Sequence, residues 1–265
     1  MIRAVVSGIR GRMGTLVAEE IAGAEGLALV AGVERRDHPD AGASCDVDGI
    51  SVPLYVDLGA IREAFDVLVD LSCPAQAAAC ARHVAAAGGG LVVGTTGLSD
   101  AERAEIETAA ESRRVVVAPN MSLGVNLLYG LVALAARTLG TGFDIEIVEE
   151  HHRAKRDAPS GTAARLLGIA AAARGLDDGS EVHGRSGATG PRGEREIGVH
   201  AVRAGGIVGR HAVSLVSDVE EITLRHEALS RRAFARGAVA AATFAGAGPP
   251  GLYTMEDVLG LERRG

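Results

Sequence analysis

The chain has 265 residues, 47% of them hydrophobic, so it is long enough to bury a substantial core as one large or two modest domains. Its net charge of -7 at pH 7 argues against a nucleic-acid surface, although a local basic cluster remains compatible with a small anionic ligand. The three cysteines lack metal-ligand spacing, and no apolar run of about 18 residues is free of charge or frequent glycine, so we expect a cytoplasmic protein without a metal site, disulfide framework or membrane span.

The first part of the chain alternates β-like and helical segments. A β-like run at residues 2–6 is followed by a glycine turn and an amphipathic segment that begins near Gly11. Further β-like runs cover residues 27–33, 66–71, 91–93 and 114–118, and helical runs cover 74–87 and 100–112. This alternation predicts an α/β fold with a parallel, doubly wound sheet of the Rossmann type.

The pattern changes after Asn120 and predicts a second domain of α+β character, with a mixed, largely antiparallel sheet. Three successive period-two runs indicate an antiparallel meander, and two final helices are expected to pack on the first domain. We therefore expect a dinucleotide-binding domain at 1–122 and 232–265 and a substrate domain at 123–231. The predicted segments are helices at 125–138, 160–174, 231–244 and 255–259, a strand at 143–150, a glycine-rich loop at 184–193, and period-two runs at 196–203, 207–217 and 221–226.

A glycine-rich loop directly after the first strand predicts a dinucleotide site. Its three glycines provide a tight turn, a close approach to pyrophosphate and helix packing, and the N–H groups at the helix start attract phosphate. The spacing is G-x-x-G-x-x-G, and a purely structural turn remains an alternative. The loop contains Gly8, Ile9, Arg10, Gly11, Arg12, Met13 and Gly14, of which all but the last are predicted to contact the cofactor.

The next β-like run ends at Val33 and is followed by Glu34, 20 residues beyond Gly14. A carboxylate at this place accepts hydrogen bonds from the ribose hydroxyls of NAD, whereas the adjacent Arg35 and Arg36 would suit the 2′-phosphate of NADP. We therefore expect NADH or NADPH as cofactor. A solvated turn is the alternative interpretation of the arginines.

Two further loops follow later parallel strands and are expected to line the cofactor cleft, because ligands of open α/β sheets bind beyond the carboxyl ends of the strands. Ordinary turns with capping residues would have a similar sequence. The predicted contacts are Gly94, Thr95 and Thr96 in one loop and Ala118, Pro119, Asn120 and Met121 in the other.

Lys155 is the single lysine among 27 basic residues. Chance is one explanation, but an ammonium can donate a proton near neutrality whereas a guanidinium cannot. Five of the six residues from His151 to Arg156 are cationic or can become so. A solvated basic loop is the alternative, and the pair His151-His152 is not by itself a zinc spacing.

The residues after this basic run favour binding of an anion. Pro159 lies near the start of a helix whose first turn contains Ser160, Gly161 and Thr162, so N–H groups and hydroxyls gather at the positive end of the helix dipole. Imidazoles, an ammonium and an anion site together suit an anionic substrate that is protonated while it is reduced.

These residues resemble the 4-hydroxy-tetrahydrodipicolinate reductase family, also called dihydrodipicolinate reductase. The segment His151-His152-x-x-Lys155-x-Asp157-Ala158-Pro159-Ser160-Gly161-Thr162-Ala163 is similar to the substrate motif of that family. The glycine loop, Glu34-Arg35, Gly94–Gly97, and Asn120 with Gly124-Val125-Asn126 also resemble family motifs in order, over nearly the whole chain.

The resemblance implies NAD(P)H-dependent reduction of 4-hydroxy-tetrahydrodipicolinate, by way of dihydrodipicolinate, in the diaminopimelate route to lysine. It implies His151 as acid/base and Lys155 as proton donor, with His152, Ser160, Gly161 and Thr162 on the substrate carboxylates. It also implies a homotetramer formed by the sheets of the substrate domain.

The sequence departs from the family pattern at two places: Ile9-Arg10 stands where relatives often have small residues, and Cys73 stands where some relatives have a basic residue. Two other functions remain as alternatives. A different dehydrogenase would share the glycine loop but not the motif at 151–162, and a nucleotide-binding regulator would need neither the ammonium nor the paired imidazoles.

Overall fold

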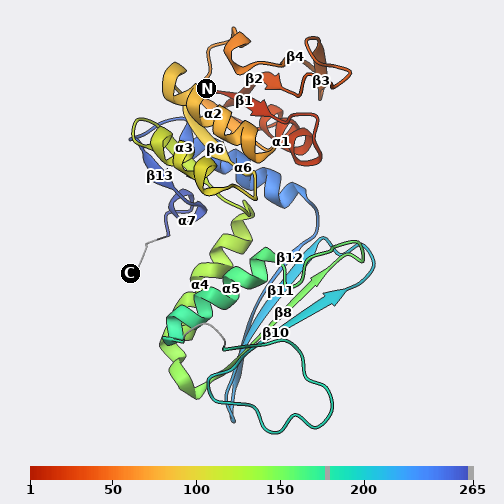
Figure 1. The fold of residues 1–265 in the computed structure, drawn as a ribbon, viewed down its shortest axis with the longest axis vertical. Coiled ribbons are helices and arrows are strands. Elements are labelled where there is room, and N and C mark those ends of the chain that lie inside the picture. Colours follow the sequence, from red (N-terminus) through yellow and green to blue (C-terminus); the bar gives the residue numbers. More distant parts are fainter. Residues whose placement is uncertain (177–179, 262–265) are drawn as a thin grey trace. The chain divides into compact units, whose positions relative to one another are not determined.

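The structure is a computed structural model that describes residues 1–176 and 180–261. The chain forms two compact units: unit 1 comprises Met1–Leu123 and Arg231–Gly265, and unit 2 comprises Gly124–Ser230. In Figure 1, the first residues of the chain, in red, and residues 232–258, in blue, lie within the same unit. The domain boundaries expected from the sequence lie one residue away from those of the two units.

In the described part of unit 1, eight strands form one sheet in the order β13-β7-β6-β5-β1-β2-β4-β3. All neighbouring strands run parallel except β3 and β4, which form an antiparallel hairpin. The central parallel strands were expected from the sequence, whereas the hairpin and β13 were not. The strands are β1 (Ile2–Ser7), β2 (Leu27–Val33), β3 (Ser44–Val47), β4 (Ile50–Tyr55), β5 (Val67–Asp70), β6 (Gly90–Val93), β7 (Arg114–Val117) and β13 (Gly251–Tyr253).

Helices cover both faces of this sheet. Ala4 and Val6 of β1 pack in one core with α1 and α6, whereas Val5 packs in a second core with α2 and α3. This is the doubly wound arrangement that the alternating pattern predicts. The helices are α1 (Arg12–Ala22), η1 (Leu58–Ala60), α2 (Pro74–Ala87), α3 (Asp100–Ala110), α6 (Arg232–Ala245) and α7 (Met255–Val258).

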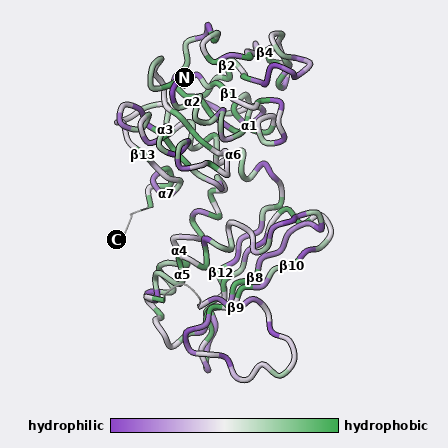
Figure 2. Tube along the Cα trace, viewed as in Figure 1, coloured by the Kyte–Doolittle hydropathy of each residue, from purple (hydrophilic) through white to green (hydrophobic). Residues whose placement is uncertain are grey.

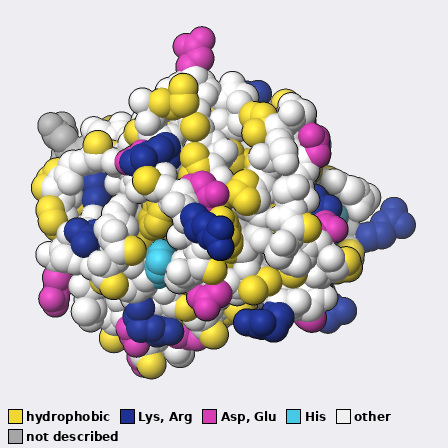
Figure 3. Space-filling model, turned by 90° about the horizontal axis from the view of Figure 1, so that it is seen from above, with side chains coloured by type: hydrophobic (Ala, Val, Ile, Leu, Met, Phe, Trp, Pro, Cys, Tyr) yellow, Lys and Arg dark blue, Asp and Glu magenta, His cyan; other side chains and the backbone are white. Residues whose placement is uncertain are grey.

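Several charged side chains on unit 1 form ion pairs. Arg3 bonds Asp66 at 2.8 Å, and Arg232 contacts both Glu19 at 2.6 Å and Glu20 at 2.9 Å. On the face drawn in Figure 3, acidic and basic side chains are likewise interspersed. That face therefore offers no broad basic surface of the kind that binds nucleic acid.

Unit 2 contains a mixed sheet in the order β12-β11-β8-β10-β9, covered on one face by α4 and α5. Both final helices of the chain belong to unit 1, as the sequence predicts. The elements are α4 (Leu123–Leu139), η2 (Gly140–Gly142), β8 (Asp144–His151), α5 (Gly161–Arg174), β9 (Glu181–Val182), β10 (Ile197–Arg203), β11 (Gly209–Val216) and β12 (Glu221–Ala228).

The meander predicted for the last three period-two runs is wrong. Only β11 and β12 form an antiparallel hairpin, because β8 lies between β11 and β10. β10 pairs in parallel with β8, with Ile197 opposite Ile145 and Arg203 opposite His151. The alternation of residues identifies a half-buried strand but carries no information about its neighbour, so this long-range pairing was missed.

Residues Leu123–Gly142, which include α4, form one helical stretch long and apolar enough to cross a membrane by length and composition. The sequence alone indicates no such stretch, because Arg137 and four glycines lie within it. Figure 2 shows hydrophobic residues along much of α4. Its residues Val125, Leu128 and Val132 lie in the core of unit 2, as in the core helices of globular proteins, which meet the same criterion.

Candidate functional site

The glycine loop of unit 1 has the geometry of a pyrophosphate site. Gly8 has a φ of +75°, and its carbonyl accepts the Gly11 N–H at 2.9 Å. A Cβ at Gly14 would lie 1.9 Å from the Gly8 oxygen, so no other residue fits the start of α1 without a backbone shift. Gly11 caps α1 without a side chain, which leaves the N–H groups of its first turn to an anion.

The four other residues of the loop differ in their surroundings. Ile9 is buried and its side chain fills the space above Gly32, where a Cβ would lie 2.7 Å from Ile9 Cδ1. Arg10 is exposed and pairs with Asp40 at 3.1 Å. Ile9 thus belongs to the core, and only its backbone is available to a cofactor, whereas Arg12 is exposed and Met13 is half-buried.

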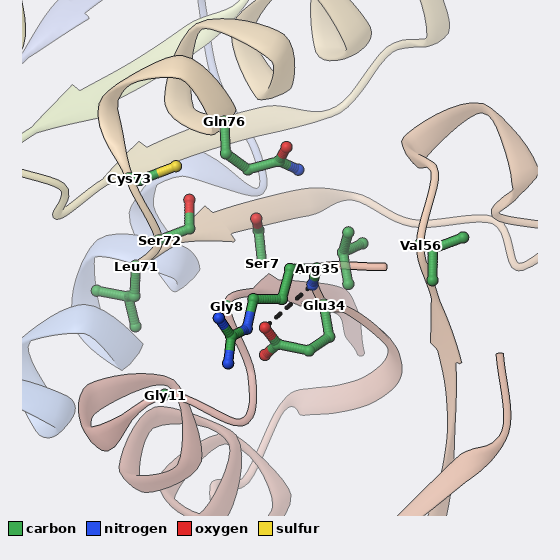
Figure 4. A pocket seen from close by; sticks show the side chains of 11 residues that line it. Ser7, Gly8, Gly11, Glu34, Arg35, Val56, Leu71, Ser72, Cys73 and Gln76 are labelled. Carbon is green, nitrogen blue, oxygen red and sulfur yellow. Dashed lines mark hydrogen bonds between the residues drawn. The ribbon is translucent and has the colours of Figure 1, made fainter. Parts of the chain in front are cut away.

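A cavity of about 340 Å³ lies beside this loop. Figure 4 shows Glu34 and Arg35 reaching into it from the end of β2, across from Cys73 and Gln76 at the start of α2. Its walls also include Ser7, Gly8, Gly11, Val33, Val56, Leu71 and Ser72. The glycine loop and Glu34, which the sequence predicts as cofactor contacts, are therefore brought together in one cavity.

Glu34 is held by the loop it faces. Its carboxylate accepts the backbone N–H of Arg10 at 3.0 Å and that of Arg35 at 3.0 Å. The Arg35 guanidinium lies 3.5 Å from Asp37, and both side chains are largely exposed. The cavity thus offers an ordered acceptor for ribose hydroxyls and a basic side chain that already has an acidic neighbour.

The loops after β6 and β7 follow the carboxyl ends of these strands. Thr95 is buried, accepts the Ser72 N–H at 3.0 Å and donates to Asp70 at 2.5 Å. Asn120 Oδ1 accepts the Ser122 N–H at 2.9 Å, which fixes an Asx turn. Gly94 and Thr96 flank Thr95, Thr96 is exposed, and in the other loop Ala118 and Met121 are buried whereas Pro119 is exposed.

Asp70 is a fully buried carboxyl group that the sequence reasoning missed. It ends β5 and also accepts the Ser72 hydroxyl at 2.5 Å, so it joins the loops after β5 and β6. Burial raises the pKa of Asp70, and the hydrogen bonds from Ser72 and Thr95 oppose this effect only partly. The signal in the sequence was an acid at the end of an apolar strand.

In unit 2, the predicted acid/base His151 ends β8 beside a buried glutamate. Its Nδ1 lies 2.6 Å from Glu149 Oε2, and Glu149 has no exposed surface. Lys155 lies four residues further on, and its Nζ donates to Asp157 Oδ2 at 2.9 Å. The Lys155 N–H also donates to the His152 carbonyl at 3.0 Å, so the motif is an ordered turn.

The predicted carboxylate site is the first turn of α5. Ser160 caps this helix, with its hydroxyl accepting the Ala163 N–H at 3.1 Å and lying 3.0 Å from His211 Nε2. The Ser160 N–H donates to Glu149 Oε1 at 3.1 Å. Ser160 is thus bonded within the protein, while Gly161 is exposed at the surface of the turn and Thr162 is half-buried.

Burial and charge set the protonation of this cluster. Burial lowers the pKa of His151, and the hydrogen bond to Glu149 opposes that effect. Burial alone would raise the pKa of Glu149, but hydrogen bonds from Arg203 and His151 outweigh it and lower the pKa. Burial also lowers the pKa of His211 to about 4, so this ring is neutral near pH 7.

Among residues 1–176 and 180–261, no group of three His, Cys, Asp or Glu side chains is arranged to hold a metal ion. Sequence reasoning missed three residues of the cluster, Glu149, Arg203 and His211, because strand pairing brings the last two to the motif. The geometry of unit 2 supports proton transfer at the His151 imidazole and the Lys155 ammonium. The cavity in unit 1 is a separate site with the form expected for a dinucleotide.

Comparison with known proteins agrees with this geometry. The chain matches the family described as "Dihydrodipicolinate reductase, N-terminus" over residues 2–121 and "Dihydrodipicolinate reductase, C-terminus" over residues 124–259. The 4-hydroxy-tetrahydrodipicolinate reductase of Anaeromyxobacter sp. (strain Fw109-5) is 44% identical over 98% of both chains. That of Rubrobacter xylanophilus (strain DSM 9941 / JCM 11954 / NBRC 16129 / PRD-1) is 46% identical, again over 98% of both.

Among solved structures, dipicolinate-bound dihydrodipicolinate reductase from Paenisporosarcina sp. TG-14 is similar, with a TM-score of 0.77 and 28% identity. The similarity covers 96% of this chain and 97% of that one. Both units therefore have counterparts in one group of enzymes. The chain belongs to the dihydrodipicolinate reductase family.

Proposed function

We propose that this chain reduces 4-hydroxy-tetrahydrodipicolinate, by way of dihydrodipicolinate, to tetrahydrodipicolinate in the diaminopimelate route to lysine. It is an oxidoreductase that depends on a pyridine nucleotide, and its substrate is a small dicarboxylate. Family membership supports the reaction. The structural observation that carries it is the hydrogen bond between the buried Glu149 and His151, a histidine four residues before the single lysine.

The cofactor site fits a dinucleotide because the loop leaves room only for backbone at Gly8 and Gly14. When bound, the nicotinamide supplies a hydride to the substrate. The residues proposed to hold the cofactor are Gly8, Ile9, Arg10, Gly11, Arg12, Met13, Glu34, Arg35, Gly94, Thr95, Thr96, Ala118, Pro119, Asn120 and Met121.

The residues of unit 2 are proposed to bind the dicarboxylate and to supply its proton. Lys155 carries the proton on Nζ, where Asp157 holds the ammonium. His151 exchanges a proton as acid/base. His152, Gly161 and Thr162 are proposed to bind carboxylate, and Ser160 contributes by fixing the first turn of α5 through its cap.

An assay of NADH and NADPH oxidation with enzymatically generated substrate tests this function. The expected result is oxidation that requires the cyclic substrate. A nucleotide-binding regulator would bind either cofactor yet leave it reduced, and a different dehydrogenase would be inactive with this substrate. Either outcome would exclude the proposed reaction.

Use of both NADH and NADPH is proposed, because Glu34 and Arg35 lie in the same cavity. Glu34→Ala should raise KM for NADH by about tenfold or more, the cost of a lost hydrogen bond to a charged group, and should affect NADPH less. Glu25→Ala, at an exposed acid elsewhere in unit 1, is the control. Equal losses with both cofactors would mean that Glu34 does not bind the ribose.

A cytoplasmic homotetramer is proposed, in which the sheets of unit 2 pair through the face opposite α4 and α5. Small residues lie on that face of strand β11, at Ala212 and Ser214. Small side chains permit close approach of a second sheet.

A further inference from the structure

Glu149 is a buried acid of unit 2 with several hydrogen-bond donors around it. Its carboxylate has no exposed surface and contacts donors from three elements. His151 Nδ1 lies 2.6 Å away, the Ser160 N–H donates at 3.1 Å, and Arg203 donates through two nitrogens at 2.8 and 2.7 Å. A buried carboxylate is stable only when it is paired and hydrogen-bonded in this way.

The bond to Glu149 defines which nitrogen of His151 can exchange a proton. An ionised carboxylate only accepts hydrogen bonds, so Nδ1 carries hydrogen and Nε2 is the exchanging atom. A Cβ at Gly209 would lie 3.1 Å from Nε2, and the His211 ring lies at 5.2 Å between centroids. Glu149 on one side and these neighbours on the other thus hold the imidazole in one orientation.

Arg203 connects the same carboxylate to the loop that contains Lys155. Its second guanidinium nitrogen donates to the Asp157 carbonyl at 2.7 Å, and the Asp157 side chain accepts from Lys155 at 2.9 Å. Arg203 is the last residue of β10 and pairs with His151 in the sheet. The parallel pairing of β10 with β8 therefore delivers the counter-charge for Glu149.

We propose that Glu149 is a positioning residue for proton transfer by His151, and that Arg203 holds its carboxylate in place. Glu149 fixes the tautomer and orientation of the imidazole, while Arg203 orients the carboxylate and ties it to the Lys155 loop. This inference rests on the proposed function in one respect: it assumes that His151 exchanges a proton with the substrate.

The charged and titratable groups that face His151 are Glu149 from β8, Lys155 from the following loop, Arg203 from β10 and His211 from β11. Glu149 raises the pKa of His151, whereas Lys155 and Arg203 lower it, as burial does. Removing Glu149 or Arg203 should therefore move the pKa of His151 in opposite directions. A loss of packing alone would not be expected to shift the pKa of His151 in opposite directions in the two variants.

The experiment compares the variants Glu149→Gln and Arg203→Gln with the wild-type protein. In Glu149→Gln, kcat should fall by about tenfold or more, and the limb of the pH–rate profile due to His151 should move to lower pH. In Arg203→Gln the same limb should move to higher pH. The matched control is Glu150→Gln, whose carboxylate pairs with Arg210 at 3.2 Å on the other face of β8 and should leave the limb in place.

The imidazole of His151 is also titrated by NMR in the protein without substrate, with its signal assigned by the loss in His151→Asn. If the pKa of His151 moves in opposite directions in Glu149→Gln and Arg203→Gln, the positioning role is supported. If the wild-type protein is at the same time inactive with the cyclic substrate, the proposed reaction is rejected. Shifts of the same sign, or none, would overturn the positioning role whatever the activity. If Glu149→Gln fails to fold, the upward shift required of Arg203→Gln still decides the matter.

Discussion

At the scale of single residues, the prediction about Lys155 depends on the difference between an ammonium and a guanidinium. Lys155→Arg keeps the positive charge beside Asp157 but removes a proton that can be transferred near pH 7. We expect kcat to fall about 10²-fold, within the usual range of general acid catalysis. Arg153→Lys, at an exposed position of the same loop, is the control, and near-normal turnover in Lys155→Arg would reject the assignment.

Asp70 gives a prediction about stability and pH. Its folded pKa is raised, mainly by burial, so its contribution to stability is complete below the unfolded value of about 3.9 and is lost as the pH rises through the folded value. Asp70→Asn is neutral at every pH, so its free energy of unfolding relative to wild type should increase as the pH rises from about 3.5, below the unfolded pKa, to about 7. Urea unfolding at the two values measures this difference.

Asp66 lies just before the strand that Asp70 ends, and its contribution to stability should depend on pH in the opposite direction. Hydrogen bonds from Arg3 lower its pKa to about 2, so its contribution is present at neutral pH and is lost as the pH falls through that value. Asp66→Asn should therefore be less stable than wild type at pH 7, with a difference that shrinks on acidification. Equal pH dependence of the two variants would contradict both assignments.

The sequence could predict the residues of the site that lie in one segment, but not those brought in by pairing. The motif from His151 to Thr162 and the loop from Gly8 to Gly14 are local, so their chemistry is readable from spacing. Arg203 reaches Glu149 over 54 residues, and only the order of strands in unit 2 determines that contact. The role of Ser160 as a bonded helix cap likewise follows from the neighbours Glu149 and His211.

At the scale of elements, helices were predicted to within one or two residues at most ends because their caps are local. α5 begins after the Ser160 cap and ends before Gly175, which has a φ of +60°. The β3–β4 hairpin was missed although Asp48-Gly49 between its strands, both with positive φ, is a typical two-residue hairpin turn. Pairing of β10 with β8 had no comparable local signal.

The packing of α6 gives a prediction at this scale. A Cβ at Gly237 would lie 1.6 Å from the Met121 carbonyl oxygen, so Gly237→Ala forces backbone atoms apart. We expect a loss of about 1–3 kcal/mol in the free energy of unfolding, the usual cost of overpacking. Thermal or urea unfolding followed by circular dichroism measures it.

Gly168→Ala in α5 is the matched control, because nothing lies within 4 Å of the new Cβ. Alanine is the better helix former, so this variant should gain about 0.5–1 kcal/mol. A loss of similar size in both variants would mean that the close approach of α6 to Met121 is not the cause.

At the scale of the whole molecule, the two units divide the work between cofactor and substrate in the proposed function. Unit 1 contains the dinucleotide cavity and unit 2 the proton-transfer cluster. The chain leaves unit 1 near Leu123 and returns near Arg231, which is why the final helices belong to the first unit. This organisation was predictable, since the change of pattern after Asn120 and the last alanine-rich helix are both visible in the sequence.

The proposed tetramer makes a prediction about mass. A chain of 27.0 kDa should sediment as a species about four times as heavy if the sheets of unit 2 pair.

Ala212 lies on the open face of β11, opposite Val148 and Arg225 of its neighbours, so Ala212→Arg would place an unpaired charge at the centre of that face. Analytical ultracentrifugation should then show smaller species, with the fold retained by circular dichroism. Ala172→Arg, at an exposed position of α5, adds the same charge away from the sheet and should stay tetrameric; if Ala212→Arg does so too, the open face is not the interface.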